Sequence, residues 1–220
     1  LSPVPSVCGA GSGPECQQDE AMQVKVTLPD GAVLEVPAGT SVHGVAEAIG
    51  PGLAKATVAG EVDGVIVDQR HPIDGDVSIR IITRKDPEAL AVLRHSAAHL
   101  MAMAVKNLWP DVHLGFGPAV EDGFFYDFDV AEPFSLDDLE RIEQEMARLV
   151  AAKIPYERSE VTREEAAKIL DGMGEDLKVE HVSDIPEDTL SFYRNGDFSD
   201  LCEGPHVRST GEIAAVKLLK

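Results

Sequence analysis

Apolar and polar residues alternate in two short segments near the start of the chain, residues 22–28 and 32–37. A period of two is typical of a strand with one buried face, and the Pro-Asp-Gly sequence between the segments favours a tight turn. We therefore expect a hairpin here. Residues 42–49 should form a helix, because Thr40 or Ser41 can cap its start and a Gly-Pro-Gly sequence stops it.

Three strand-like segments follow at residues 56–62, 64–68 and 77–83, with Asp-Gly pairs at the bends. A hairpin, a helix and short strands in this order are the plan of a ubiquitin-like β-grasp domain. The pattern predicts such a domain over residues 22–84.

The next segment begins with a helix-start signal. Asp86 can serve as the N-cap and Pro87 fits the first helical position, so a helix should run from here to about Trp109. Residues 112–120 and 124–130 then flank a Glu-Asp-Gly sequence, which predicts a second hairpin.

Two capping boxes predict the next helices. Ser135 and Asp138 precede a long acidic helix that should reach Lys153, and Thr162 and Glu165 precede a shorter helix.

Two later segments, residues 176–182 and 190–202, look strand-like, and an Asn-Gly turn divides the second into a hairpin. We expect the second domain, residues 85–220, to be an antiparallel sheet covered by helices. The fold class of the whole chain is then α+β.

Composition adds an expected leader and a cellular setting. Residues 1–21 are rich in Pro, Gly and Ser without periodicity, which predicts a disordered leader that holds two of the three cysteines. Cys202 stands alone in the folded part, so a disulfide framework is not expected. No apolar run reaches the ~20 residues that span a bilayer, and no signal-type segment opens the chain. A soluble, cytoplasmic protein without a membrane partner is expected.

The charge argues against one class of protein. The formal net charge is −20 and no cluster of Lys and Arg forms a basic stripe. A module that held nucleic acid by neutralising phosphates would need such a stripe. If RNA is the partner, most of the affinity must come from another domain or from a brief contact with the end of the RNA.

Two short clusters carry the candidate chemistry. His95 and His99 lie one turn apart on one face of the predicted helix, and Cys202 and His206 repeat the spacing in a Cys-Glu-Gly-Pro-His sequence. Four of the chain's ten His and Cys residues lie in these clusters, which favours one shared site. Three imidazoles and a thiol suit either a tetrahedral zinc site or a small polar pocket for acid-base chemistry.

The same residues resemble a known family. The segments HSAAHLMAMAVKNLWP, GFFYDFD and DLCEGPHV are similar to the editing domain of bacterial threonyl-tRNA synthetases, and residues 22–83 resemble the TGS domain at the start of those enzymes. The resemblance covers residues 22–220, and on it the chain is expected to be an N-terminal fragment.

The resemblance implies a function. It implies hydrolysis of the ester that joins serine to the 3′ end of threonine tRNA, without a metal. ATP and zinc would then serve only the absent aminoacylation domain, and a homodimer would form through absent domains. The expected partners are threonine tRNA and the enzyme's own catalytic and anticodon-binding domains.

The resemblance also implies roles for particular residues. We expect His95 to position the ribose hydroxyl or the attacking water, and Lys178 to orient the ester and stabilise developing negative charge. Asp200 would receive the substrate amine. The expected substrate-binding residues are His99, Tyr126, Asp200, Cys202, His206 and Gly117, the last by permitting close approach of the backbone.

Two alternatives stay open. One is a zinc-dependent hydrolase of the alanyl type, with His95, His99, Cys202 and His206 as ligands. The other is a non-catalytic binding module in which the TGS domain is the interaction surface. Measured turnover separates the two classes.

Overall fold

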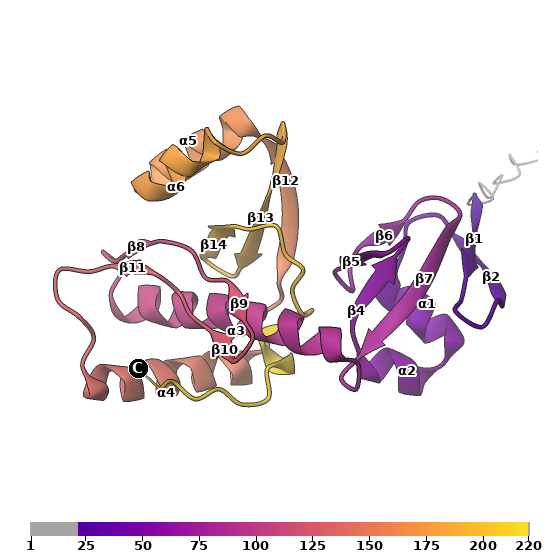
Figure 1. Cartoon of the computed structure of the whole chain (residues 1–220), viewed down its shortest axis with the longest axis horizontal. Helices are drawn as coiled ribbons and strands as arrows, with labels where there is room; N and C mark the ends of the chain where they lie inside the picture. Colours follow the sequence, from indigo (N-terminus) through magenta and orange to yellow (C-terminus); the bar gives the residue numbers. More distant parts are fainter. Residues whose placement is uncertain (1–21, 220) are drawn as a thin grey trace, which may run out of the picture.

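The computed structural model describes residues 22–219, so the predicted disordered leader lies outside the described residues (Figure 1). The first domain is built on a five-stranded sheet of order β2-β1-β7-β4-β5, in which β1 and β7 are parallel. Its strands are β1 (Gln23–Thr27), β2 (Val33–Pro37), β4 (Thr57–Val62), β5 (Val65–Val67) and β7 (Val77–Thr83), and a short pair joins β3 (Thr40–Ser41) to β6 (Pro72–Ile73). The predicted β-grasp plan is confirmed.

The helices of this domain differ from prediction in one respect. Helix α1 (Val42–Ile49) is capped by Ser41, whose hydroxyl accepts a hydrogen bond from the Gly44 N–H at 3.1 Å. The Gly-Pro-Gly sequence ends α1, but it also starts a second helix, α2 (Pro51–Ala56). Proline fits the first turn of a helix because the N–H that it lacks has no intrahelical partner there.

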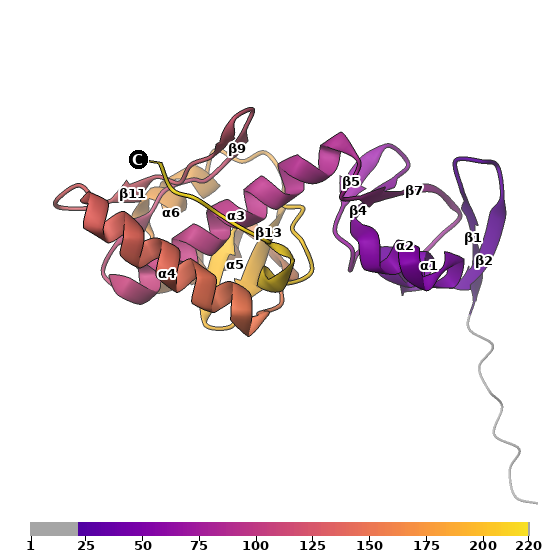
Figure 2. The same ribbon diagram turned by 90° about the horizontal axis from the view of Figure 1, so that it is seen from below.

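Helix α3 (Pro87–Leu108) connects the two domains and runs beside helix α4 (Leu136–Ala152) through the second (Figure 2). Asp86 is its N-cap residue, as predicted, but its carboxylate accepts hydrogen bonds from the Thr83 N–H and hydroxyl instead of from the first helical turn. Asp86 thus ties the start of α3 to Thr83 at the end of β7.

The predicted second hairpin is present as two short strand pairs. The pairs are β9 (Ala119–Val120) with β10 (Gly123–Phe124), and β8 (His113–Leu114) with β11 (Phe128–Asp129). Both predicted capping boxes are also present, at the starts of α4 (Leu136–Ala152) and α5 (Arg163–Met173).

A three-stranded antiparallel sheet lies between these helices. It consists of β12 (Glu157–Thr162), β13 (Thr189–Asn195) and β14 (Phe198–Leu201), followed by a short 3₁₀ turn, η1 (Thr210–Glu212). In Figure 1 the helices α5 and α6 lie above this sheet and α3 and α4 below it. The expected antiparallel sheet with helical cover is confirmed as an α+β arrangement.

One predicted strand is wrong. Residues 176–182 form a helix, α6 (Asp176–Val182), in which Lys178 and Val182 are buried on one face. The alternation of apolar residues at Leu177 and Val179 resembled a strand. In a segment this short, however, the pattern fits the two-residue period of a strand and the 3.6-residue period of a helix equally well. Burial of the i and i+4 positions decided for the helix.

One apolar cluster spans the two domains, while the first domain also has a core cluster of its own. Val58 and Ile82 of the first domain pack in the same cluster as Ala89 and Val92 of α3, and all four are almost inaccessible to solvent. Between residues 22 and 219, no helix is both long enough and apolar enough to cross a membrane.

Candidate functional site

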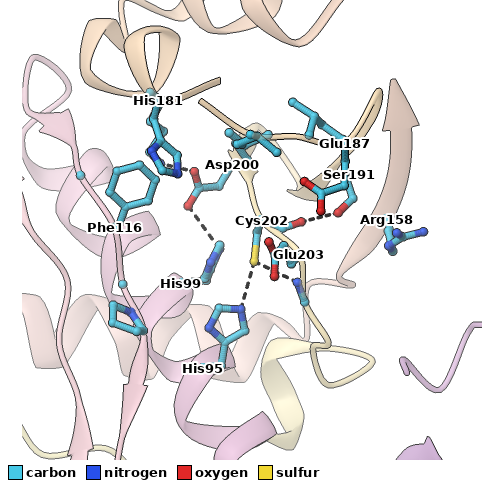
Figure 3. Close-up of a pocket in the computed structure, with 18 of the residues that line it drawn as sticks. His95, His99, Phe116, Arg158, His181, Glu187, Ser191, Asp200, Cys202 and Glu203 are labelled. Atoms are coloured by element: carbon cyan, nitrogen blue, oxygen red, sulfur yellow. Dashed lines mark hydrogen bonds and ion pairs between the residues drawn. The ribbon is translucent and has the colours of Figure 1, made fainter. Parts of the chain in front are cut away.

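A cavity of about 580 Å³ opens in the second domain, between α3, the loop around Phe116, α6 and the sheet (Figure 3). Most of the residues predicted for the site line this cavity. They are His95, His99, Gly117, Tyr126, Lys178, Asp200 and Cys202.

The two motifs meet as predicted. The Nε2 atom of His95 lies 3.0 Å from the Cys202 sulfur, and the Nε2 atom of His206 lies 3.4 Å from it on another side. The rings of His95 and His206 stack with centroids 4.4 Å apart. The cluster has four members: His95, His99, Cys202 and His206. Each offers one possible metal-ligand atom, and these four atoms all lie within 4.8 Å of one another. The fold therefore brings the two motifs together into one cluster.

His206 lies behind the cavity and does not line it. The Gly204–Pro205 turn carries the chain inward, and the buried His206 Nδ1 atom lies 3.2 Å from the Ser96 hydroxyl. The Val207 N–H donates to the same hydroxyl at 3.0 Å. These bonds tie the segment to α3, so His206 supports Cys202 from beneath and does not itself face the cavity.

Lys178, Asp200 and Tyr126 form a second buried group at the cavity. The Tyr126 hydroxyl donates to Asp200 Oδ2 at 2.6 Å and accepts from Lys178 Nζ at 3.1 Å. Lys178 also forms an ion pair with Asp200 Oδ1. Each buried charge thus has a partner of opposite sign, which burial of charge requires.

Gly117 is needed for the position of Tyr126. A Cβ atom at this glycine would lie 2.1 Å from Cδ2 of the Tyr126 ring. Gly117 thus lets the Tyr126 ring pack against the backbone, and its approach to substrate stays a prediction.

The imidazoles and the thiol are uncharged near neutral pH. Burial lowers the pKa of His99 to about 4 and the pKa of His206 well below its usual value. Burial also lowers the pKa of His95, against a hydrogen bond with the Gly117 backbone that raises it. Burial raises the pKa of the Cys202 thiol. The cluster can accept protons or hydrogen bonds, but its thiol is a poor nucleophile because the thiolate is the reactive form.

The buried histidines predict acid sensitivity. Because the pKa of His99 is 6.5 when exposed and about 4 in the folded protein, the unfolded chain binds the proton more readily between these values. Stability is therefore lost as pH falls from about 6.5 to 4, by about 3 kcal/mol from this group. Urea unfolding of chelator-treated protein from pH 7 to pH 4 measures the loss. The His99→Gln variant should lose less stability, and an equal loss would contradict the prediction.

Several residues at the site escaped sequence reasoning. The rings of Phe116 and His181 meet edge to face at the cavity wall, 4.7 Å apart, and Arg158 lies at the rim (Figure 3). Ser96 lies inside the His-Ser-Ala-Ala-His motif, so its position in the sequence could have indicated that it belongs to the site. Asp68 contacts the site from the first domain, and nothing in its local sequence indicates this.

Two protein families match separate parts of this chain. Residues 24–83 match the TGS domain, and residues 190–220 match the family described as the threonyl and alanyl tRNA synthetase second additional domain. The chain matches the N-terminal region of threonyl-tRNA synthetases.

Curated relatives named threonine–tRNA ligase show the extent of the match. The chain is 50% identical over 196 residues to the protein of Pelobacter propionicus and 52% identical over 196 residues to that of Hahella chejuensis. In both cases the alignment covers 89% of this chain and 31% of the relative. The chain therefore spans about a third of the length of these synthetases, in a region that has an editing-type second additional domain.

Proposed function

We propose that this chain hydrolyses the ester of serine wrongly attached to threonine tRNA, as the editing part of a cytoplasmic threonyl-tRNA synthetase. The observation that supports it most is the convergence of Lys178, Asp200 and Tyr126 with His95 and Cys202 around one cavity. Convergent polar groups in a concave site are the usual mark of a binding or catalytic centre.

The need for such a reaction follows from the size of the two amino acids. Serine lacks one methyl group of threonine, and one such group is worth only ~1–3 kcal/mol of discrimination. A second site must then accept the smaller product and reject the larger one. A pocket with fixed polar groups and a wall made by Phe116 and His181 suits this selection.

His95 is the histidine best placed to act on substrate. Its side chain is half-buried at the cavity, whereas His99 and His206 are buried. A neutral imidazole here can hold the ribose hydroxyl or accept a proton from the attacking water. Its Nε2 atom contacts the Cys202 thiol, so substrate or water would take over this contact.

Lys178 and Asp200 would bind the two ends of the seryl group. The Lys178 ammonium can stabilise the negative charge that develops on the ester oxygen. Asp200 would bind the substrate amine. Its carboxylate oxygens accept hydrogen bonds from Tyr126 and Lys178, and they keep further lone pairs that can accept from the amine. In this proposal His99 and Cys202 shape the serine end, and His206 holds Cys202 in place.

The tRNA would be held mainly outside this chain. With a net charge of −20, the chain cannot attract a polyanion by itself. We infer that the enzyme's catalytic and anticodon-binding domains supply most of the tRNA affinity and that its dimer contacts lie there.

Release of amino acid from charged tRNA tests the proposal. We expect serine to leave threonine tRNA at least about tenfold faster than threonine, because the extra methyl group must meet the pocket wall. The measurement follows labelled serine or threonine after mixing with the chain at high concentration. Tyr126→Phe, which loses the hydroxyl between Lys178 and Asp200, serves as a matched variant that should be slower on serine. Equal rates for the two amino acids would overturn the proposal.

A zinc-dependent hydrolysis is the second candidate, and one observation favours it. The four donor atoms lie close enough to share an ion, and the Nδ1 atom of His206 lies within hydrogen-bond distance of the Ser96 hydroxyl, a contact that orients a zinc ligand. A bound zinc would supply an activated water. With all four residues as ligands the site would be closed, so one of them would have to leave a position for water.

We propose that hydrolysis needs no metal, and zinc content tests this. Purified chain should hold well under one zinc per molecule, and chelator should leave serine release unchanged. Stoichiometric zinc with loss of release on chelation, restored by added zinc, would establish the second candidate.

Replacing the thiol separates water attack from covalent catalysis. Cys202→Ser keeps a small polar group and should retain release within about tenfold of the unchanged chain, because the neutral thiol is not the nucleophile. The rate is measured beside Cys202→Ala. A seryl-thioester trapped on Cys202, or complete loss of release in a folded Cys202→Ser variant, would contradict this prediction.

A further inference from the structure

Asp68 reaches the site from the other domain. It follows β5 in the β-grasp domain, and its carboxylate accepts a hydrogen bond from the His206 N–H at 2.6 Å and another from the Tyr193 hydroxyl at 2.5 Å. These partners lie 138 and 125 residues away in the sequence. Both bonds cross from the first domain to the second.

We propose that Asp68 is a positioning residue for the deacylation site, acting through the turn that carries Cys202 and His206. The inference rests on the proposed function, and it assigns the TGS domain a part in editing. Neither Asp68 nor its partners Tyr193 and His206 line the cavity, so Asp68 acts through the turn they hold, in which Cys202 and Gly204 do line it.

The turn has little freedom once Asp68 is in place. Gly204 has a φ of 79°, in the left-handed region, and a Cβ atom there would lie 2.1 Å from the Tyr193 hydroxyl oxygen. One carboxylate oxygen of Asp68 accepts a hydrogen bond from that hydroxyl, and the other accepts one from the His206 N–H. The backbone between Cys202 and His206 therefore packs against the Tyr193 side chain, which Asp68 of the first domain orients.

The position of this turn sets the geometry of the cluster. The His206 ring stacks on His95, contacts the Cys202 sulfur and meets the ring of Tyr193 edge to face at 4.4 Å. The Gly204 N–H donates to the Cys202 sulfur at 3.3 Å. A shift of the turn thus moves the thiol and, through the stacked ring, His95.

The two domains are joined firmly enough for this role. Val58 and Ile82 of the first domain share an apolar cluster with α3, the helix that carries His95. A second contact, from the Arg84 guanidinium to the Glu212 carbonyl at 2.9 Å, lies at the exposed edge of the interface. Arg84 contacts neither the turn nor the cavity, so it provides a control for general weakening of the interface.

The kinetic test compares three variants of the full chain. Asp68→Ala should lower kcat for serine release by about tenfold or more with KM within about twofold, because small displacements of reacting groups are costly. Asp68→Asn should lie between this variant and the unchanged chain, since its amide oxygen can still accept from the His206 N–H. Arg84→Ala should keep kcat. An equal loss of kcat in Arg84→Ala and Asp68→Ala, or unchanged kcat in Asp68→Ala, would overturn the proposal.

An activity-independent measurement separates this inference from the proposed function. A short bond to a carboxylate should place the His206 amide proton downfield in ¹H–¹⁵N spectra, and Asp68→Ala should move it upfield together with the ring protons of His95. Arg84→Ala should leave both in place. If the unchanged chain releases no serine, the proposed function fails, while the spectra still decide whether Asp68 fixes the turn. Unchanged signals in a folded Asp68→Ala variant would refute the positioning role.

Discussion

Lys178→Ala is expected to lower the rate of serine release by about 10²-fold or more, the scale for loss of a group that stabilises developing charge. The ammonium is buried, donates to Tyr126, and pairs with Asp200 at the cavity wall. Its loss removes the cation beside the ester and leaves the buried Asp200 carboxylate without its charge partner. Single-turnover release from seryl-charged threonine tRNA measures the effect on chemistry.

Two controls keep this result interpretable. Lys178→Met keeps much of the apolar stem, so it separates loss of charge from loss of packing. Lys168→Ala removes an exposed lysine from the neighbouring helix α5 and should leave the rate unchanged. Partial recovery of Lys178→Ala by added ethylamine would support the charge argument. Retention of more than a third of the rate in a folded Lys178→Ala variant would contradict the assigned role.

Local signals in the sequence were strong where they concern a helix end or a turn. The capping boxes at Ser135 and Thr162 appear as predicted, because both partners lie within one helical turn and depend on nothing distant. The Asn-Gly turn between β13 and β14 appears for the same reason, with Gly196 at a φ of 63°.

The meeting of the two histidine motifs was predictable only in part. Spacing within each motif places two side chains on one face or at one turn, and the family resemblance predicts that the motifs meet. The depth of each residue was not predictable, because it depends on tertiary packing. His206 therefore lies behind Cys202, although it follows Cys202 at the same spacing at which His99 follows His95.

Lys178 and Asp68 show where sequence reasoning reaches its limit. Lys178 was assigned to a strand because the apolar positions in this seven-residue segment fit a strand as well as a helix. Its burial depends on contact with Asp200, which lies 22 residues later in the sequence. Asp68 follows a short strand in a different domain, and no local pattern indicates a partner 138 residues later. Contacts between domains carry no periodic signal.

His95→Ala should also lower serine release by about 10²-fold, the scale for loss of a positioned acid-base group. Among the three clustered histidines it is the one that is both half-buried and at the cavity, and burial keeps its imidazole neutral, which suits a group that accepts a proton. The release rate at pH 7 is measured with His113→Ala as the control, since His113 is exposed and does not line the cavity.

The same variant separates the two chemical mechanisms. If water is held by the imidazole, His95→Ala loses rate while the zinc content stays low in both proteins. If zinc holds the water and His95 is one of its three protein ligands, His95→Ala loses rate and metal together, because a zinc site with only two protein ligands binds weakly. A His95→Ala variant that keeps the rate of the unchanged chain would contradict both mechanisms.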